Sequence, residues 1–423
     1  MDRNIARNAL ERTRSLLAFW YVIFVFLSSL FFMLMQGGKL ASMIFFVICT
    51  VTIYLFIGNW SGIKKSSVTR KLMNTHQTGS IEAGQPLSIQ LEVSVPGFWP
   101  IPYLFIKDEL SRHNGDTYMF EESLFLDFRR KATLTYVSQP LRRGLYQYVH
   151  TDCWTEDIWG LFSHRARIAN PQSFIVTPQT ITIRQWNQYD KKARKMNVDS
   201  TTQRSHKEST QINGVREYVY GDRLSRIHWN ATAKTGLLKS KEFERESLPR
   251  TIVCLDRTKM AYADHFHFEL AVSIAASIIR YGANRKNPMS LLSAGSETTY
   301  IGTSHFQNQQ TDIIQHLITV EADSQVPLYQ VMQERIVQFK QADFIIIISP
   351  QKGSAIMQIL RWLDLRQMQS CYLHVYLERA LTDEVPSLDD EWMQQVKSRG
   401  YLGYEITQLQ DLPKKLGGVR SSV

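Results

Sequence analysis

The chain has 423 residues, of which 44% are hydrophobic and 21% are charged, so it can form two or three domains with substantial cores. This composition excludes an intrinsically disordered, collagen-like or low-complexity chain. A net charge of +10 favours anionic partners, such as an acidic membrane surface or nucleic acid. No C-x-x-C pair occurs among the four cysteines, which excludes a disulfide scaffold and a structural zinc finger. They are Cys49, Cys153, Cys254 and Cys371.

Two apolar stretches near the N-terminus predict a hairpin of transmembrane helices. Residues 16–35 and 40–57 contain no charged side chain. A helix needs about 20 apolar residues to cross about 30 Å of hydrocarbon, so the first stretch is long enough and the second just reaches. We therefore expect residues 1–63 to form a two-span anchor in the cell membrane.

The basic residues around the two spans predict their orientation. The turn between them holds only Lys39, whereas both outer flanks are strongly basic. Because positive residues stay on the cytoplasmic side, both ends of the chain should be cytoplasmic. The flanking residues are Arg3, Arg7, Arg12 and Arg14 before the first span, and Lys64, Lys65, Arg70 and Lys71 after the second.

Residues 64–183 have the pattern of short β-strands. Ser88–Val95 alternates polar and apolar residues, as a half-buried strand does, and residues 124–128 and 133–137 are further β-type runs. Pro-Gly, Asn-Gly and Arg-Gly pairs mark turns between such runs. This spacing predicts a small β sandwich or barrel.

Residues 184–213 are rich in polar side chains and predict a basic, solvated linker. Its basic cluster consists of Lys191, Lys192, Arg194 and Lys195. Such a cluster can also attach to anionic lipid or to nucleic acid, and both alternatives stay open.

The segment that follows, from Gly214 to Glu246, carries the densest pattern in the chain. Gly221 suits a turn, and the next residue, Asp222, can cap a short helix. Leu224, Ile227 and Ala231 recur at helical spacing and should face a core. Gly236 should end that helix, and residues 238–245 should be extended.

The charged residues of this segment have two interpretations. They form either a buried ion-pair network that holds the segment onto the next domain, or a site for an anion or a protein partner. The candidate site comprises Arg216, Gly221, Asp222, Arg226, Trp229, Lys234 and Glu244.

Short apolar runs alternate with helical patterns from residue 251 onward, which predicts a parallel sheet covered on both faces. The expected strands are residues 251–256, 289–293, 344–349 and 372–377. Ligands of such sheets bind beyond the carboxyl ends of the strands, where Asp256 lies. Walker, G-x-G-x-x-G and G-x-S-x-G motifs do not occur here, which argues against nucleotide binding and an α/β-hydrolase.

Three blocks of residues resemble the bacterial family called domain of unknown function 58. The first block joins Arg143-Gly144-x-Tyr146, Asp157-x-x-Gly160-Leu161-Phe162 and Val176-x-Pro178. The second runs Arg216-x-Tyr218-x-x-Gly221-Asp222-x-x-x-Arg226-Ile227-x-Trp229 and continues to Phe243 and Glu244. The third is the strand that ends in Asp256, and Lys234 departs from the arginine usual in the family.

This resemblance implies an architecture and a kind of partner. The expected fold is a membrane hairpin, a β domain and, within residues 214–423, an α/β domain like the von Willebrand factor A domain (Rossmann-type). Members of the family often accompany MoxR-type AAA+ ATPases, which implies such an ATPase as a partner.

The metal site of von Willebrand A domains offers one test of the resemblance. Its D-x-S-x-S motif supplies a carboxylate and two hydroxyls to a hard cation. Asp256 and Thr258 match, but Met260 stands in the third position, and a thioether is a poor ligand for Mg²⁺. The sequence therefore predicts a degenerate site, with Mg²⁺ as the one cofactor to test.

From these features we expect a non-enzymatic membrane adaptor that faces the cytosol and binds protein partners. The alternative is a metal-assisted hydrolase at the cell envelope that uses Asp256. A further alternative is a protein that binds nucleic acid or anionic lipid through residues 191–195.

Overall fold

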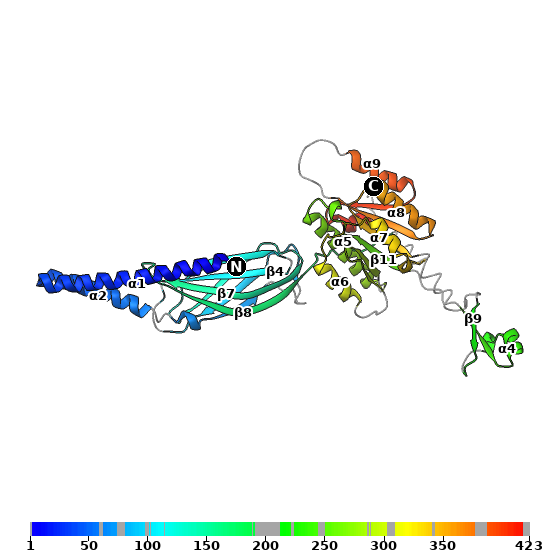
Figure 1. Ribbon diagram of the computed structural model, residues 1–423. Coiled ribbons are helices and arrows are strands. Elements are labelled where there is room, and N and C mark those ends of the chain that lie inside the picture. Colours follow the sequence, from blue (N-terminus) through cyan, green and yellow to red (C-terminus); the bar gives the residue numbers. More distant parts are fainter. Residues whose placement is uncertain are drawn as a thin grey trace. The chain divides into compact units, whose positions relative to one another are not determined.

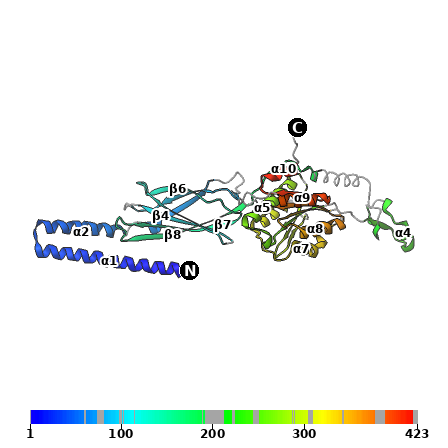
Figure 2. The same cartoon turned by 90° about the horizontal axis from the view of Figure 1, so that it is seen from above.

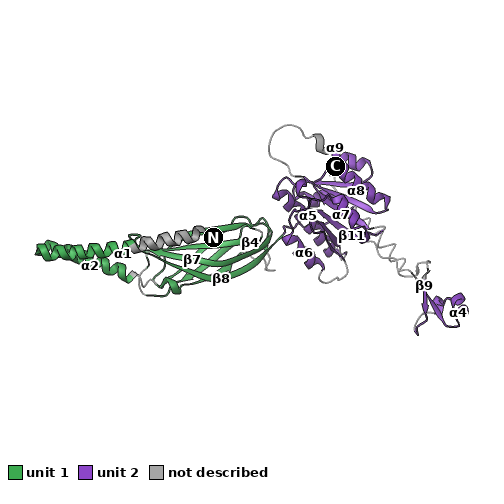
Figure 3. Cartoon of the chain, in the orientation of Figure 1, with its two compact units in different colours: residues 1–177 green, residues 178–423 purple. Residues whose placement is uncertain are grey.

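The computed structural model describes the chain as two compact units, residues 1–177 and residues 178–423 (Figure 3). The described residues are 2–58, 62–73, 81–97, 101, 103–113, 115–187, 189–190, 212–220, 224–243, 250–285, 287, 289–302, 309–340, 343–376 and 387–417. Side chains are described for all of these except residues 2–16, 212–213, 242–243 and 387–391.

The N-terminal hairpin consists of α1 (Asp2–Gln36) and α2 (Gly38–Gly58), joined at Gly37. Both Gly37 and Gly38 have positive φ, a conformation that a side chain would strain, so the reversal needs glycine. Leu17–Gln36 and Gly38–Ile57 are each long and apolar enough to cross a membrane, and little of either is buried in the protein. Two such helices suggest a membrane anchor.

The remainder of the first unit is a β sandwich. One sheet has the order β1-β3-β6 and the other the order β2-β8-β7-β4-β5. Apolar side chains from both sheets, such as Leu91 and Ile106, share one core. The strands are β1 (Ser67–Leu72), β2 (Ile81–Glu82), β3 (Ser88–Ser94), β4 (Leu104–Arg112), β5 (Thr117–Leu124), β6 (Lys131–Val137), β7 (Gly144–Glu156) and β8 (Ser163–Thr177).

Two details differ from the sequence expectation for this unit. Residues 125–128 are not a strand, because β5 ends at Leu124, and Phe125 and Phe128 are exposed. Arg70, counted in the cationic flank of the second span, lies inside the sandwich.

A buried ion pair between Arg70 and Asp108 connects the two sheets. Arg70 on β1 donates from Nε and Nη2 to the two oxygens of Asp108 on β4, at 3.1 and 2.6 Å. The Asp108 carboxylate also accepts from the hydroxyls of Tyr136 and Thr151, at 2.8 and 2.9 Å. The Arg70 guanidinium lies 3.8 Å from the centre of the Tyr148 ring. Neither charged side chain is exposed, and these donors offset the cost of burying them.

Residues 178–190 belong to the second unit, whereas the sequence patterns placed residues 178–183 in the β domain and residues 184–190 in a solvated linker. Trp186 and Tyr189 are buried in the core of the α/β domain, and Tyr189 shares a hydrogen bond with Thr251 at 3.1 Å. The basic cluster at residues 191–195 lies outside the described residues. The polar composition of this stretch indicated a linker, although its two aromatic residues, Trp186 and Tyr189, pack in the α/β core.

Residues 212–243 form a small module of two antiparallel strands and a short helix. β9 (Ile212–Glu217) pairs with β10 (Lys239–Phe243). A 3₁₀ turn, η2 (Leu224–Arg226), precedes α4 (Trp229–Thr235), which His228 caps by accepting from the N–H of Ala231. As expected, Gly236 ends the helix, with φ of 69°. Ile227 is buried as predicted, whereas Leu224 is exposed.

The α/β domain contains one six-stranded sheet in the order β13-β12-β11-β14-β15-β16. All neighbours are parallel except β13, which is antiparallel to β12. The strands are β11 (Thr251–Asp256), β12 (Met289–Ala294), β13 (Thr299–Ile301), β14 (Phe344–Ser349), β15 (Gln369–Val375) and β16 (Leu402–Ile406).

Helices cover both faces of this sheet, as the near-continuous apolar strands require (Figures 1 and 2). The core on one face includes α5 (His265–Asn284), α6 (Gln309–Thr319) and α10 (Asp411–Gly417). The core on the other face includes α7 (Leu328–Glu334), α8 (Ser354–Leu365) and α9 (Ser387–Ser398).

The substitution Arg70→Met should strongly destabilise the β sandwich, because it leaves the Asp108 carboxylate buried without its cation. We expect a loss of about 3–5 kcal/mol. This loss is measured by urea unfolding of the detergent-solubilised chain. Unfolding is monitored through the alkylation of Cys153, which is buried in the same core.

The matched control is Arg167→Met, since Arg167 also makes a two-bond pair, with Asp152 at 2.7 and 2.9 Å. This pair is exposed, so its loss should cost about 0.2–1 kcal/mol. Equal losses in the two variants would contradict a special role for the buried pair.

Candidate functional site

The strand order of the α/β sheet reverses at β11, and we call the carboxyl ends of β11 and β14 the switch point. β11 lies between β12 and β14, so the connections that follow β11 and β14 leave toward opposite sides. Asp256 ends β11 and Ser349 ends β14. These two residues meet directly, because the Ser349 hydroxyl donates to Asp256 Oδ2 at 2.6 Å.

The Asp256 carboxylate accepts four hydrogen bonds from the protein itself. Oδ1 accepts from the N–H and the hydroxyl of Thr258, at 2.9 and 2.6 Å. Oδ2 accepts from the Ser349 hydroxyl and from Nε2 of Gln351, at 2.6 and 2.9 Å. Asp256 is fully buried, so these donors replace the water that it has lost.

These residues do not fit a magnesium ion. Mg²⁺ requires six oxygen ligands in near-octahedral geometry, and the lone pairs of Asp256 already bind protein donors. Gln351 turns its amide N–H toward the carboxylate, and Met260 at the third motif position points into solvent, 91% exposed. Within the described part of the chain, no three His, Cys, Asp or Glu side chains lie together as metal ligands would.

Burial raises the pKa of Asp256, and the hydrogen bonds from Ser349, Thr258 and Gln351 partly oppose this shift. The raised pKa reflects desolvation, which penalises the charged form. Asp256 acts here as a satisfied structural acceptor and has no free oxygen with which to accept a proton from a substrate.

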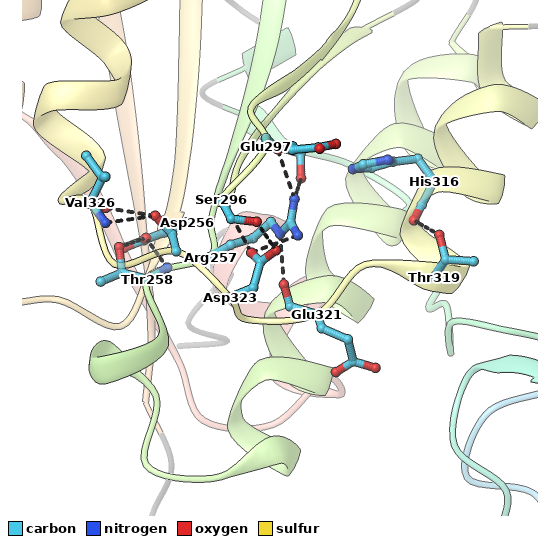
Figure 4. Close-up of polar contacts among 12 residues, drawn as sticks. Asp256, Arg257, Thr258, Ser296, Glu297, His316, Thr319, Glu321, Asp323 and Val326 are labelled. Carbon is cyan, nitrogen blue, oxygen red and sulfur yellow. Dashed lines mark hydrogen bonds and ion pairs between the residues drawn. The ribbon is translucent and has the colours of Figure 1, made fainter. Parts of the chain in front are cut away.

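Arg257, the residue after Asp256, connects the loops beside the switch point (Figure 4). Its guanidinium pairs with Asp323 at 2.8 Å and donates to the carbonyl of Glu321 at 2.8 Å. Ser296 adds two hydrogen bonds to the same Asp323 carboxylate. A side chain at Gly295 would collide with the guanidinium, so the loop after β12 needs glycine to pack against Arg257.

The pKa values of two buried cysteines, Cys153 and Cys254, argue against a role as nucleophile for either. Burial raises the pKa of Cys153 to about 12, and it also raises the pKa of Cys254, beside Asp256, well above its usual value. A thiol at neutral pH is a poor nucleophile at either position.

The candidate partner site lies on the module formed by residues 212–243. Arg216 and Lys234 are exposed, Arg226 is half-buried and Trp229 is 66% exposed. The exposed pair therefore does not belong to a buried network. The other three candidates, Gly221, Asp222 and Glu244, lie outside the described residues.

This module exposes more apolar surface than the sequence analysis anticipated. Large apolar side chains exposed by 44% or more occur throughout it, and we call this set the module surface. It comprises Val215, Val219, Tyr220, Leu224, Trp229, Leu237 and Leu238. Taken together, the seven positions lack the regular spacing of one buried helix or strand. This irregular spacing is the signal that could have revealed the surface.

A groove of about 670 Å³ between α7, α8 and α9 was not expected from the sequence. The aromatic rings of Tyr329, Trp362 and Trp392 line it, together with the cations Arg361 and Arg399. No sequence pattern singled out these aromatic residues, and only the packing of the three helices brings them around a groove.

Comparison with known proteins connects the module to a family. Residues 214–368 match the family model described as "Protein of unknown function DUF58". This segment of the chain belongs to the DUF58 family. The match begins at the module and continues through β11, β14 and α8 of the α/β domain, so Asp256 and its hydrogen-bond partners lie within the DUF58 segment.

A curated relative of this DUF58 protein is the uncharacterized protein YeaD of Bacillus subtilis (strain 168). It is 22% identical over 322 residues, which cover 74% of this chain and 77% of YeaD.

Solved structures match only about a quarter of the chain. One is the CARDB domain of the PF1109 protein from Pyrococcus furiosus, with 14% identity, coverage of 26% of this chain and 91% of that chain, and a TM-score of 0.18. Another is a superoxide reductase (neelaredoxin) from Ignicoccus hospitalis, with 13% identity, coverage of 27% and 84%, and a TM-score of 0.17. Scores this low carry no argument about the DUF58 protein.

The raised pKa of Asp256 predicts a pH dependence of stability. Because the folded-state pKa is above the unfolded value of about 3.9, the unfolded state releases this proton first as pH rises. The contribution of Asp256 to stability is therefore greatest below about pH 4 and declines until the pH passes the folded-state pKa. Asp256→Asn should lack this decline. Urea unfolding followed by labelling of buried Cys254 with 4,4′-dithiodipyridine, which reacts at acidic pH, measures both proteins.

The donor set at Asp256 also predicts the response to metal. Mg²⁺ should leave the urea midpoint of the wild-type protein unchanged. Gln351→Glu places a second carboxylate beside Asp256, and Mg²⁺ should raise the midpoint of that variant. A Mg²⁺-dependent increase in the wild type, absent from Asp256→Ala, would contradict our assignment of the site.

Proposed function

We propose that this DUF58 protein is a membrane-anchored adaptor that binds a protein partner through the module surface. The observation that carries the proposal is the exposure of seven large apolar side chains within residues 215–238. A high density of exposed large apolar side chains on a small folded module favours an interaction site. Trp229 and Tyr220 are of the residue types that contribute most to binding energy in protein interfaces.

The charge of the module supports a partner with an acidic rim. Residues 212–243 contain six basic and three acidic side chains, a net charge of +3. Arg216 and Lys234 are exposed on the module. Exposed basic residues favour association with an acidic surface, and exposed apolar side chains stabilise the complex.

Membrane attachment in this proposal depends on the hairpin of α1 and α2. Their basic outer flanks support a topology in which both chain ends are cytoplasmic. Arg70 is buried in the sandwich, but Lys64, Lys65 and Lys71 remain exposed in the flank of the second span. The module would then meet a cytoplasmic partner.

We also propose that the α/β domain is like the von Willebrand factor A domain. Numbered along the domain, its strands lie in the order 3-2-1-4-5-6, and the third strand is antiparallel. This arrangement supports the likeness, as does the position of Asp256 after the first strand. The resemblance of the chain to its family suggests a MoxR-type AAA+ ATPase as the partner.

Other functions have less support. A metal-assisted hydrolase would need ligand atoms on Asp256 that Thr258, Ser349 and Gln351 occupy. Nucleic acid could stack on Trp229 and Tyr220, but it gains little from the exposed Leu224, Leu237 and Val219. The aliphatic share of the module surface therefore favours a protein.

The proposal predicts that Trp229→Ala and Leu224→Ala weaken partner binding by about tenfold or more. Crosslinking in membranes followed by affinity purification and quantitative mass spectrometry measures the loss. Both side chains are exposed, so their truncation should leave the fold intact, as resistance of Cys254 to alkylation would confirm.

Leu365→Ala is the matched control, because Leu365 is an exposed leucine on α8, outside the module surface. It should retain the partner. Recovery of the same proteins with all three variants would contradict the proposal, and nuclease-sensitive binding that weakens steeply with salt would favour nucleic acid instead.

A further inference from the structure

One end of the β sandwich is the end at which the chain enters from α2. Four residues separate the end of α2 from the 3₁₀ turn η1 (Ile63–Lys65), which leads into β1. The first residue of β1, Ser67, pairs with Ser94 of β3, which pairs with Lys131 of β6. The connections β3–β4, β5–β6 and β7–β8 therefore all lie at this end, which we call the helix-side end.

The connections at the helix-side end expose large apolar side chains. Phe125 and Phe128 in the β5–β6 connection are 80% and fully exposed, and Ile158 and Trp159 in the β7–β8 turn are 64% and 51% exposed. At the opposite end, Met73 after β1 is 55% exposed, whereas no large apolar side chain is exposed among the described residues of the β4–β5 and β6–β7 connections. The exposed aromatic side chains of the described connections therefore lie at the helix-side end.

The β7–β8 turn has the structure of a preformed apolar tip. The Asp157 carboxylate accepts from the backbone N–H groups of Trp159, Leu161 and Phe162, at 2.8, 3.1 and 2.8 Å. Gly160 adopts a φ of 65°, and its N–H donates to the Asp157 carbonyl. Because these polar groups are satisfied within the turn, its transfer into a layer with little water costs less.

Trp159 also lies at a definite level along α2. Its ring makes an edge contact with Tyr54, with 5.5 Å between the ring centres. Tyr54 precedes the last residue of α2 by four positions, or about 6 Å along the helix axis. If α2 spans the bilayer, this level is the headgroup layer, which tryptophan and tyrosine favour.

We propose that the helix-side end of the sandwich is a membrane-interface surface, with Phe125, Phe128, Ile158 and Trp159 immersed in the lipid headgroup layer. The exposed Lys64 and Lys65 beside it favour anionic lipid. This proposal rests on the membrane anchoring proposed above and adds a third point of attachment to the two spans. The β sandwich thus stands on the bilayer by the end from which it is tethered.

Site-specific fluorescence in liposomes tests this surface. Full-length protein carrying Cys49→Ser is labelled with the environment-sensitive dye NBD at Ile158→Cys or Phe128→Cys, since the other native cysteines are buried. The liposomes contain phosphatidylcholine and phosphatidylglycerol, with a doxyl quencher near the headgroup. We expect blue-shifted emission and at least threefold stronger quenching than at the control position.

The control is Val137→Cys, because Val137 is 60% exposed at the far end of β6. A second label at Met43→Cys, exposed on α2, reports the span itself through a quencher deep in the acyl chains. Quenching at Met43 with equal signals at residues 158, 128 and 137 would overturn the interface surface and leave the anchor standing. Absence of quenching at Met43 would overturn both.

Discussion

The bidentate pair between Arg70 and Asp108 is the interaction on which the β sandwich depends. Arg70 lies in the first strand after the apolar hairpin, and its guanidinium reaches β4, the Thr151 hydroxyl on β7 and the Asn170 carbonyl on β8. One side chain thus connects the tethered strand to the opposite sheet. Because both charges are buried, the network is stable only when every partner is present, which makes the docking of β1 an all-or-none event.

The second unit also contains a buried carboxylate, that of Asp256. Hydrogen bonds from neutral donors, rather than a cationic side chain, offset the cost of burying it. Domains that bind a cation at this edge satisfy the carboxylate with metal, whereas here the Gln351 amide and two hydroxyls supply the positive hydrogen atoms. Tyr372 donates to the Gln351 carbonyl, so the loop that carries the amide is itself held in place. The loops that carry Thr258 and Gln351 are therefore held in place by protein contacts, and a partner could recognise them without any metal.

Local patterns predicted the central strands of the α/β domain, but not what tertiary packing decides. Apolar runs located β11, β12, β14 and most of β15. Two edge strands, β13 and β16, are partly buried and carry no continuous apolar run, so they were missed. Trp186 and Tyr189 were assigned to a linker because the pairing of an aromatic residue with a distant core is not visible in local composition.

Exposure was the property that sequence reasoning estimated worst, and it is also the property that carries the functional argument. Leu224 has the spacing of a core residue and residues 124–128 have the composition of a strand, yet Leu224 and Phe128 face outward. An apolar side chain left in water costs free energy, so two such surfaces on one chain require two environments that accept them. Our proposals assign the sandwich loops to the bilayer that the hairpin would cross and the module surface, with its aliphatic and basic residues, to a protein partner. The division of these surfaces between the two units is what one expects of a chain that holds a partner at a membrane.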